Sequence, residues 1–165
     1  MYKIGELVVY SNEGVCKIEE ISELNIPGVN KSKKYYILAP MHGNGKVFVP
    51  IDTKAFMRAI ITYEEIQNSI SKVSLIDNFE HDMKNARALE DHYKKLLKSY
   101  ECIDLLNIMA SIDNKKNNLM KNGKKLNQID EKFMKIAKNL LDEEFSMVLG
   151  IPKEEVERYI QNKIN

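Results

Sequence analysis

The sequence predicts an α+β protein in which a small five-stranded β-barrel of the SH3 or Tudor type is followed by an all-α helical bundle of about five helices. In residues 1–61, short segments rich in Val, Ile, Tyr and Phe are separated by turn residues, as in the strands of a small barrel. In residues 62–165, apolar residues recur at three- and four-residue spacing, which is typical of amphipathic helices. These two ranges are the predicted domains.

The barrel part is expected to contain five strands, at residues 7–10, 15–26, 34–39, 46–51 and 56–61. Apolar residues of the second strand change face near Glu19 and Glu20. Side chains of a strand alternate with a period of two, so this change predicts a β-bulge. Residues 41–45 contain two glycines and predict a tight turn between the third and fourth strands.

The helical part is predicted to begin at Thr62, because Thr62 and Glu65 have the spacing of a capping box. Further helices are expected at 83–100, at 102–112, at 129–148 and after Pro152. The third of these should be capped near Asn127 and end at Gly150. Residues 114–125, mostly Lys and Asn, are expected to form a helix end and a loop.

The composition is that of an ordinary folded protein. It is 44% hydrophobic and 30% charged with a net charge of +1, so only local patches could attract nucleic acid or a membrane. No segment approaches the roughly 18 apolar residues of a membrane span, and no signal peptide is recognised. We therefore expect a cytoplasmic protein in which Cys16 and Cys102 are buried and reduced.

Catalytic motifs are missing from the sequence. His42, His81 and His92 lie in separate predicted elements, and neither cysteine has a partner at metal-ligand spacing. Glu143 and Glu144 could be an acid–base pair, but neighbouring residues on a helix point in different directions, which favours solvated charge. We expect no enzyme, no cofactor and no metal site. A hydrolase or ligand-binding enzyme with an unrecognised pocket is the alternative.

The edge of the barrel is the first candidate binding site. Its residues carry apolar groups on more than one strand face and comprise Leu24, Ile26, Lys46, Val47 and Phe48. An edge strand can accept a strand from a partner protein, although the same residues could instead cover the helical domain. A further alternative is an aromatic cage for a methylated cation, built from Tyr10, Tyr35, Tyr36 and Phe48.

Positive charge in the helical part is the second candidate. The basic residues of one predicted helix are Lys84, Arg87, Lys94, Lys95 and Lys98, and more lysines gather in 115–125. Such patches neutralise phosphates without reading bases. A solvated helix face is the alternative.

The motifs of the barrel part occur in a characteristic order. They are YKIGELVVY at 2–10, EGV at 13–15, IEEI at 18–21, YYIL at 35–38 and VFVP at 47–50. This order resembles CarD-family transcription regulators, whose barrel also occurs in transcription-repair coupling factors. The helical part is similar to the CarD C-terminal domain in LLKS at 96–99, in the apolar helix from Ile103, and in 126–137.

The resemblance implies that the barrel binds the β-subunit lobe of bacterial RNA polymerase through its strand edge. It also implies that the helical domain lies against melted promoter DNA and modulates open-complex stability without sequence-specific recognition. In typical members a tryptophan wedges into the minor groove. No membrane and no small-molecule substrate is implied.

The sequence departs from this family pattern at several positions. It contains no tryptophan, and Ala86 stands at the wedge position. Ala88 and Asp91 stand where relatives carry basic residues, while Leu24 and Phe48 stand where relatives can carry polymerase-contacting arginines. The alternative function is therefore a polymerase-binding protein or competitor that does not itself engage DNA.

Overall fold

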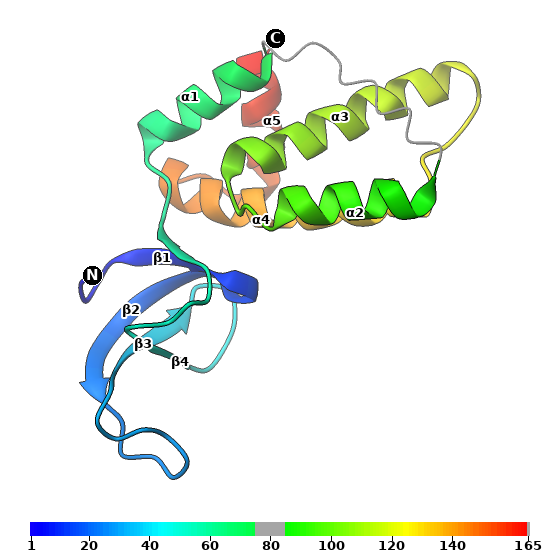
Figure 1. Cartoon of the computed structure of the whole chain (residues 1–165). Coiled ribbons are helices and arrows are strands. Elements are labelled where there is room, and N and C mark those ends of the chain that lie inside the picture. Colours follow the sequence, from blue (N-terminus) through cyan, green and yellow to red (C-terminus); the bar gives the residue numbers. More distant parts are fainter. Residues whose placement is uncertain (75–84, 165) are drawn as a thin grey trace. The chain divides into compact units, whose positions relative to one another are not determined.

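The computed structural model describes residues 1–74 and 85–164. The chain divides into two units, Met1–Ile60 and Ile61–Asn165. Among the described residues, all strands lie in the first unit and all α-helices in the second (Figure 1). The predicted α+β layout is therefore confirmed.

The first unit is a five-stranded antiparallel sheet. Its strands are β1 (Leu7–Tyr10), β2 (Gly14–Glu23), β3 (Lys34–Pro40), β4 (Val47–Pro50) and β5 (Met57–Ala59), and a 3-10 turn, η1 (Ser11–Glu13), joins β1 to β2. The order is β4-β3-β2-β1-β5, so the ladder is open between β4 and β5. The register shifts between Ile18 and Glu20, which confirms the predicted bulge. β2 is strongly curved (Figure 1).

Strand β2 ends earlier than predicted, at Glu23. The expectation that Leu24 and Ile26 belong to this strand is wrong. The Val29 N–H donates to the Ile26 carbonyl at 3.2 Å across Pro27 and Gly28, and Gly28 has φ +86°. Pro followed by a glycine of positive φ is the signature of a type II turn, which takes the chain out of the sheet.

Two small cores lie on opposite faces of the sheet. The inner one contains Val8, Cys16, Ile18, Tyr36, Leu38 and Val49. The outer one contains Leu24, Tyr35 and Ile37. Strand β3 is thus buried on both faces, because its side chains alternate between the two cores. Tyr35 and Tyr36 therefore cannot line one aromatic cage.

The second unit is helical. Its helices are α1 (Tyr63–Ser74), α2 (Ala86–Leu97), α3 (Cys102–Lys121), α4 (Gln128–Leu149) and α5 (Lys153–Ile164). Helix α3 packs against α1, α2 and α4. The fully buried side chains of this unit include Ile66, Leu106, Phe133, Leu141 and Phe145. Within residues 1–74 and 85–164, no helix is long and apolar enough to cross a membrane.

The predicted helix ends are confirmed where local signals define them. The Thr62 N–H donates to Glu65 Oε2 at 2.8 Å, and the Glu65 N–H donates to Thr62 Oγ1 at 3.2 Å, which completes the capping box. Asn127 Oδ1 accepts the Asp130 N–H at 2.8 Å at the start of α4. Gly150 ends that helix at φ +66°.

One other helix end differs from the prediction. Helix α2 ends at Leu97, and the predicted continuation to Tyr100 is wrong, since Tyr100 has φ +51°. Its predicted first residues, Met83 and Lys84, lie outside the described residues. Residues 114–121 form the end of helix α3 and residues 122–125 leave it, as predicted, with Gly123 at φ +68° in the turn.

Candidate functional site

Strand β4 is an open edge of the sheet. The Ile51 N–H donates to the Lys34 carbonyl at 3.1 Å, and hydrogen-bonded pairs alternate along an antiparallel ladder. Val47 and Val49 therefore direct their backbone groups toward β3. Phe48 directs its N–H and carbonyl toward the open edge, where a partner strand could use both.

The Phe48 side chain lies on the outer face of the sheet. Phe48 is paired with Ile37, and residues opposite each other in an antiparallel pair share a face. Ile37 is buried, whereas Phe48 is 44% exposed. An aromatic ring of this exposure beside an open backbone edge is a combination suited to protein binding.

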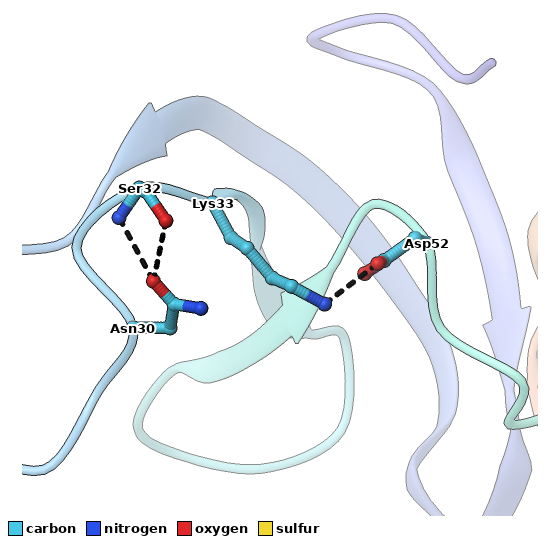
Figure 2. A network of polar contacts seen from close by, with 4 residues as sticks. All are labelled: Asn30, Ser32, Lys33 and Asp52. Carbon is cyan, nitrogen blue, oxygen red and sulfur yellow. Dashed lines mark hydrogen bonds and ion pairs between the residues drawn. The ribbon is translucent and has the colours of Figure 1, made fainter.

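A polar network ties the loop before β3 to the segment after β4 (Figure 2). Lys33 Nζ lies 2.7 Å from Asp52 Oδ2, and Asn30 Oδ1 accepts from the Ser32 N–H and hydroxyl at 3.0 and 2.7 Å. The hydrogen bond between the two charged groups raises the pKa of Lys33 and lowers the pKa of Asp52. Exposed ion pairs add little stability, and this one joins the loop before β3 to the chain just after the end of β4.

The predicted polymerase-contact residues fall into two groups. Lys46, Val47 and Phe48 lie along or just before β4, and Lys46 Nζ is 3.3 Å from Glu19 Oε2 on the β2 bulge. Leu24 and Ile26 lie in the loop after β2. Ile26 is exposed, but the expected exposure of Leu24 is wrong, because its side chain fills the outer core.

Comparison with known families indicates a binding partner for the N-terminal unit. Residues 2–61 match the family model described as CarD-like/TRCF RID domain. The N-terminal unit is a CarD-like RID domain. Such a domain interacts with RNA polymerase and is not an enzyme. No curated protein matches the chain.

Downstream of the RID domain, the predicted DNA-binding residues lie on the surface. Ala86, Arg87, Lys94, Lys95 and Lys98 are all exposed, while Lys84 lies outside the described residues.

Not every one of these charges is free. Lys94 Nζ and Lys132 Nζ lie 3.3 and 3.4 Å from Glu90 Oε1, and both lysines lower the pKa of Glu90. No carboxylate in the described part of the chain forms a salt bridge with Arg87, Lys95 or Lys98. These three residues form the free positive charge of α2.

Sequence reasoning missed three buried acids of the helical unit, Asp130, Asp142 and Glu144. Asp130 is fully buried, accepts the Tyr93 hydroxyl at 2.7 Å and lies 2.6 Å from Lys115 Nζ. Burial and the bond to Asp130 raise the pKa of Tyr93. Asp130 and Glu144 fall on the buried stripe of α4 at three- and four-residue spacing, which is the signal that could have found them.

The expectation that Glu143 and Glu144 are both solvated is wrong for Glu144. It is 3% exposed, and its carboxylate accepts the Ile61 N–H at 2.8 Å and the Cys102 thiol at 3.3 Å. Both cysteines are buried, as predicted. Glu144 therefore fixes the first residue of the helical unit to its core.

A polar groove lies between α4 and α5. It is lined by Lys138, Asn139, Asp142, Glu143, Lys153 and Glu154. Lys138 Nζ lies 2.7 Å from Asp142 Oδ2 and 3.3 Å from Glu157 Oε2. Burial lowers the pKa of Lys138, but Asp142 and Glu157 together raise it by more, so the net shift of this pKa is upward. The groove is an ion-pair network that links two helices.

Proposed function

We propose that this protein binds the β-subunit lobe of bacterial RNA polymerase through the open β4 edge and thereby alters the lifetime of promoter open complexes. The RID family match supports polymerase as the partner. The proposed mode of binding rests on one observation: the backbone of Phe48 faces the open edge, and this residue is 44% exposed.

The proposed contact is strand addition. A partner strand donates to the Phe48 carbonyl and accepts from its N–H, and the Phe48 ring packs on the partner's side chains. Pro50 has no N–H and limits the pairing at one end. Lys46 at the other end is exposed, and its charge is paired with Glu19 on β2.

Phe48→Asp in the full-length chain tests this interface. The substitution places a charge where a ring would be desolvated, so we expect binding to a β-lobe fragment to weaken by at least about 30-fold, the loss expected at a central aromatic contact. Isothermal titration calorimetry measures the affinity, and circular dichroism checks that the sheet is retained.

Met120→Asp is the matched control, because it also replaces an exposed apolar residue but lies in the helical unit. It should bind the β-lobe fragment like the unchanged protein. Equal affinity of Phe48→Asp and the unchanged protein would show that the interface does not use β4.

DNA binding by the helical unit is the second candidate function. It is favoured by Arg87, Lys95 and Lys98, which are exposed and have no salt bridge in the described part of the chain. On this proposal they hold the DNA backbone beside the polymerase, without base readout. The alternative is a polymerase-binding protein or competitor that leaves DNA untouched.

Lys95→Glu with Lys98→Glu separates these alternatives. If both lysines contact phosphates, the slope of log affinity against log salt should fall by about 1.8, since each contact contributes about 0.9. Fluorescence anisotropy with duplex DNA measures the slope. Lys54→Glu with Lys72→Glu changes the net charge equally at exposed positions elsewhere. The same affinity in all three proteins would reject the α2 contact.

A further inference from the structure

The two edges of the RID sheet differ in how their backbone is covered. The strand order β4-β3-β2-β1-β5 leaves β4 and β5 as the outer strands. An outer strand presents N–H and carbonyl groups that a strand of another chain can use. In the described part of the chain, no side chain bonds the backbone of Phe48 at the β4 edge. At the β5 edge, side chains cover the outward carbonyls.

The phase of the β1–β5 ladder shows which carbonyls of β5 point outward. The Ile60 N–H donates to the Leu7 carbonyl at 3.1 Å, and hydrogen-bonded pairs alternate along an antiparallel ladder. Arg58 therefore directs its backbone groups toward β1. The carbonyls of Met57 and Ala59 point away from β1, to the outer side of the sheet.

Both of these outward carbonyls accept a hydrogen bond from a side chain. The Tyr2 hydroxyl donates to the Met57 carbonyl at 3.0 Å, and Arg58 Nη1 donates to the Ala59 carbonyl at 3.1 Å. Neighbouring strands lie about 4.7–4.9 Å apart, so the hydroxyl and the guanidinium occupy space that the backbone of an added strand would need. A strand can pair with β5 only after displacing both groups.

The Tyr2 side chain is held in this position from β3. The Tyr2 N–H donates to the Tyr36 hydroxyl at 3.2 Å, and the two rings meet edge to face at a centroid distance of 6.0 Å. Tyr36 is buried in the inner core. Tyr2 thus links a fixed core residue of β3 to the outer carbonyl of β5.

The residues that follow Tyr2 are also anchored to the sheet. The Gly5 N–H donates to the Ile18 carbonyl at 2.7 Å, and the Ile18 N–H donates to the Glu6 carbonyl at 2.9 Å. The Glu6 N–H donates to the Lys3 carbonyl at 3.1 Å with Gly5 at φ +89°, as in a type II turn. The opening segment is therefore a built part of the domain that places Tyr2 over β5.

We propose that Tyr2 and Arg58 determine which edge of the RID sheet accepts a partner strand, because they cover β5 and leave β4 as the binding edge. This inference rests on strand addition as the proposed mode of binding. Without the cover, β4 of one copy could pair with β5 of the next, and such a head-to-tail contact repeats into open assemblies. The cover keeps β4 available to polymerase.

Tyr2→Phe with Arg58→Ala in the full-length chain tests this role. The double variant removes both donors but keeps the ring against Tyr36. We expect sedimentation velocity to show assemblies that grow with protein concentration, whereas the unchanged protein sediments as one species. Adding Phe48→Asp to the double variant should remove the assemblies, because a charge on β4 opposes pairing at that edge.

Tyr63→Phe with Arg158→Ala is the matched control. It removes the same two groups from exposed residues of α1 and α5, and it should sediment like the unchanged protein. Arg58→Ala alone uncovers only the Ala59 carbonyl, so its assemblies should be smaller than those of the double variant. Circular dichroism checks that each variant keeps the sheet.

Three results would overturn the proposal. The double variant could sediment like the unchanged protein at every concentration, or the control could assemble equally. Assemblies that persist after Phe48→Asp would come from misfolding and not from pairing of β4 with β5. Sedimentation is measured without the β-lobe fragment, so a failed edge cover leaves the calorimetric result for Phe48→Asp intact, and the reverse also holds.

Discussion

At the scale of single residues, the clearest feature is the buried carboxylate of Asp130. It has no exposed surface and depends on Tyr93 and Lys115 for compensation. A buried charge without partners would be strongly destabilising. The Tyr93 hydroxyl therefore has a structural role that its ring, packed against Phe133 at a centroid distance of 5.1 Å, does not fulfil.

Tyr93→Phe isolates this hydroxyl because the ring remains. We expect the free energy of unfolding of the helical unit to fall by about 1–3 kcal/mol, the cost of leaving a buried charged acceptor short of a donor. Urea denaturation followed by circular dichroism measures the change. Tyr63→Phe removes a hydroxyl from a 57% exposed residue and should change stability by less than about 0.5 kcal/mol. Equal effects of the two variants would refute the role of the bond.

At the scale of elements, the sequence predicts best the features that depend on neighbouring residues. The Thr62–Glu65 capping box, the Asn127 cap and the Gly150 stop are each determined within one helical turn. The bulge in β2 was predictable for a similar reason, because a change of face within one strand requires an extra residue.

Features that depend on tertiary packing could not be predicted in this way. Leu24 is apolar, and nothing local indicates whether it faces a core or a partner; the turn at Pro27 decides that it fills the outer core. Glu144 lies on the buried stripe of α4, but only the positions of Ile61 and Cys102 show what its carboxylate binds there. At the candidate site, the sequence predicted exposed apolar residues along the barrel edge, which holds for Phe48 at 44% exposed but not for the buried Leu24.

At the scale of the whole molecule, the two units have separate hydrophobic cores. The core of the helical unit contains residues from Ile66 to Ile160. The inner core of the RID domain contains residues from Val8 to Val49. No buried residue belongs to both clusters among those described. Each unit therefore has its own source of hydrophobic stabilisation, as expected for a binding domain joined to a second module.

Phe133→Ala tests this separation. Phe133 is 2% exposed in the helical core, so its truncation should cost the helical unit about 3–5 kcal/mol. The RID domain should keep its stability, because its inner core contains no helical residue. Amide hydrogen exchange followed by NMR distinguishes the units, with Leu38 reporting on the sheet and Leu141 on the helices. Val8→Ala should give the reciprocal pattern. If the amide exchange rates of Leu38 and Leu141 rise by the same factor in Phe133→Ala, the two units unfold as one cooperative structure and their cores are energetically coupled.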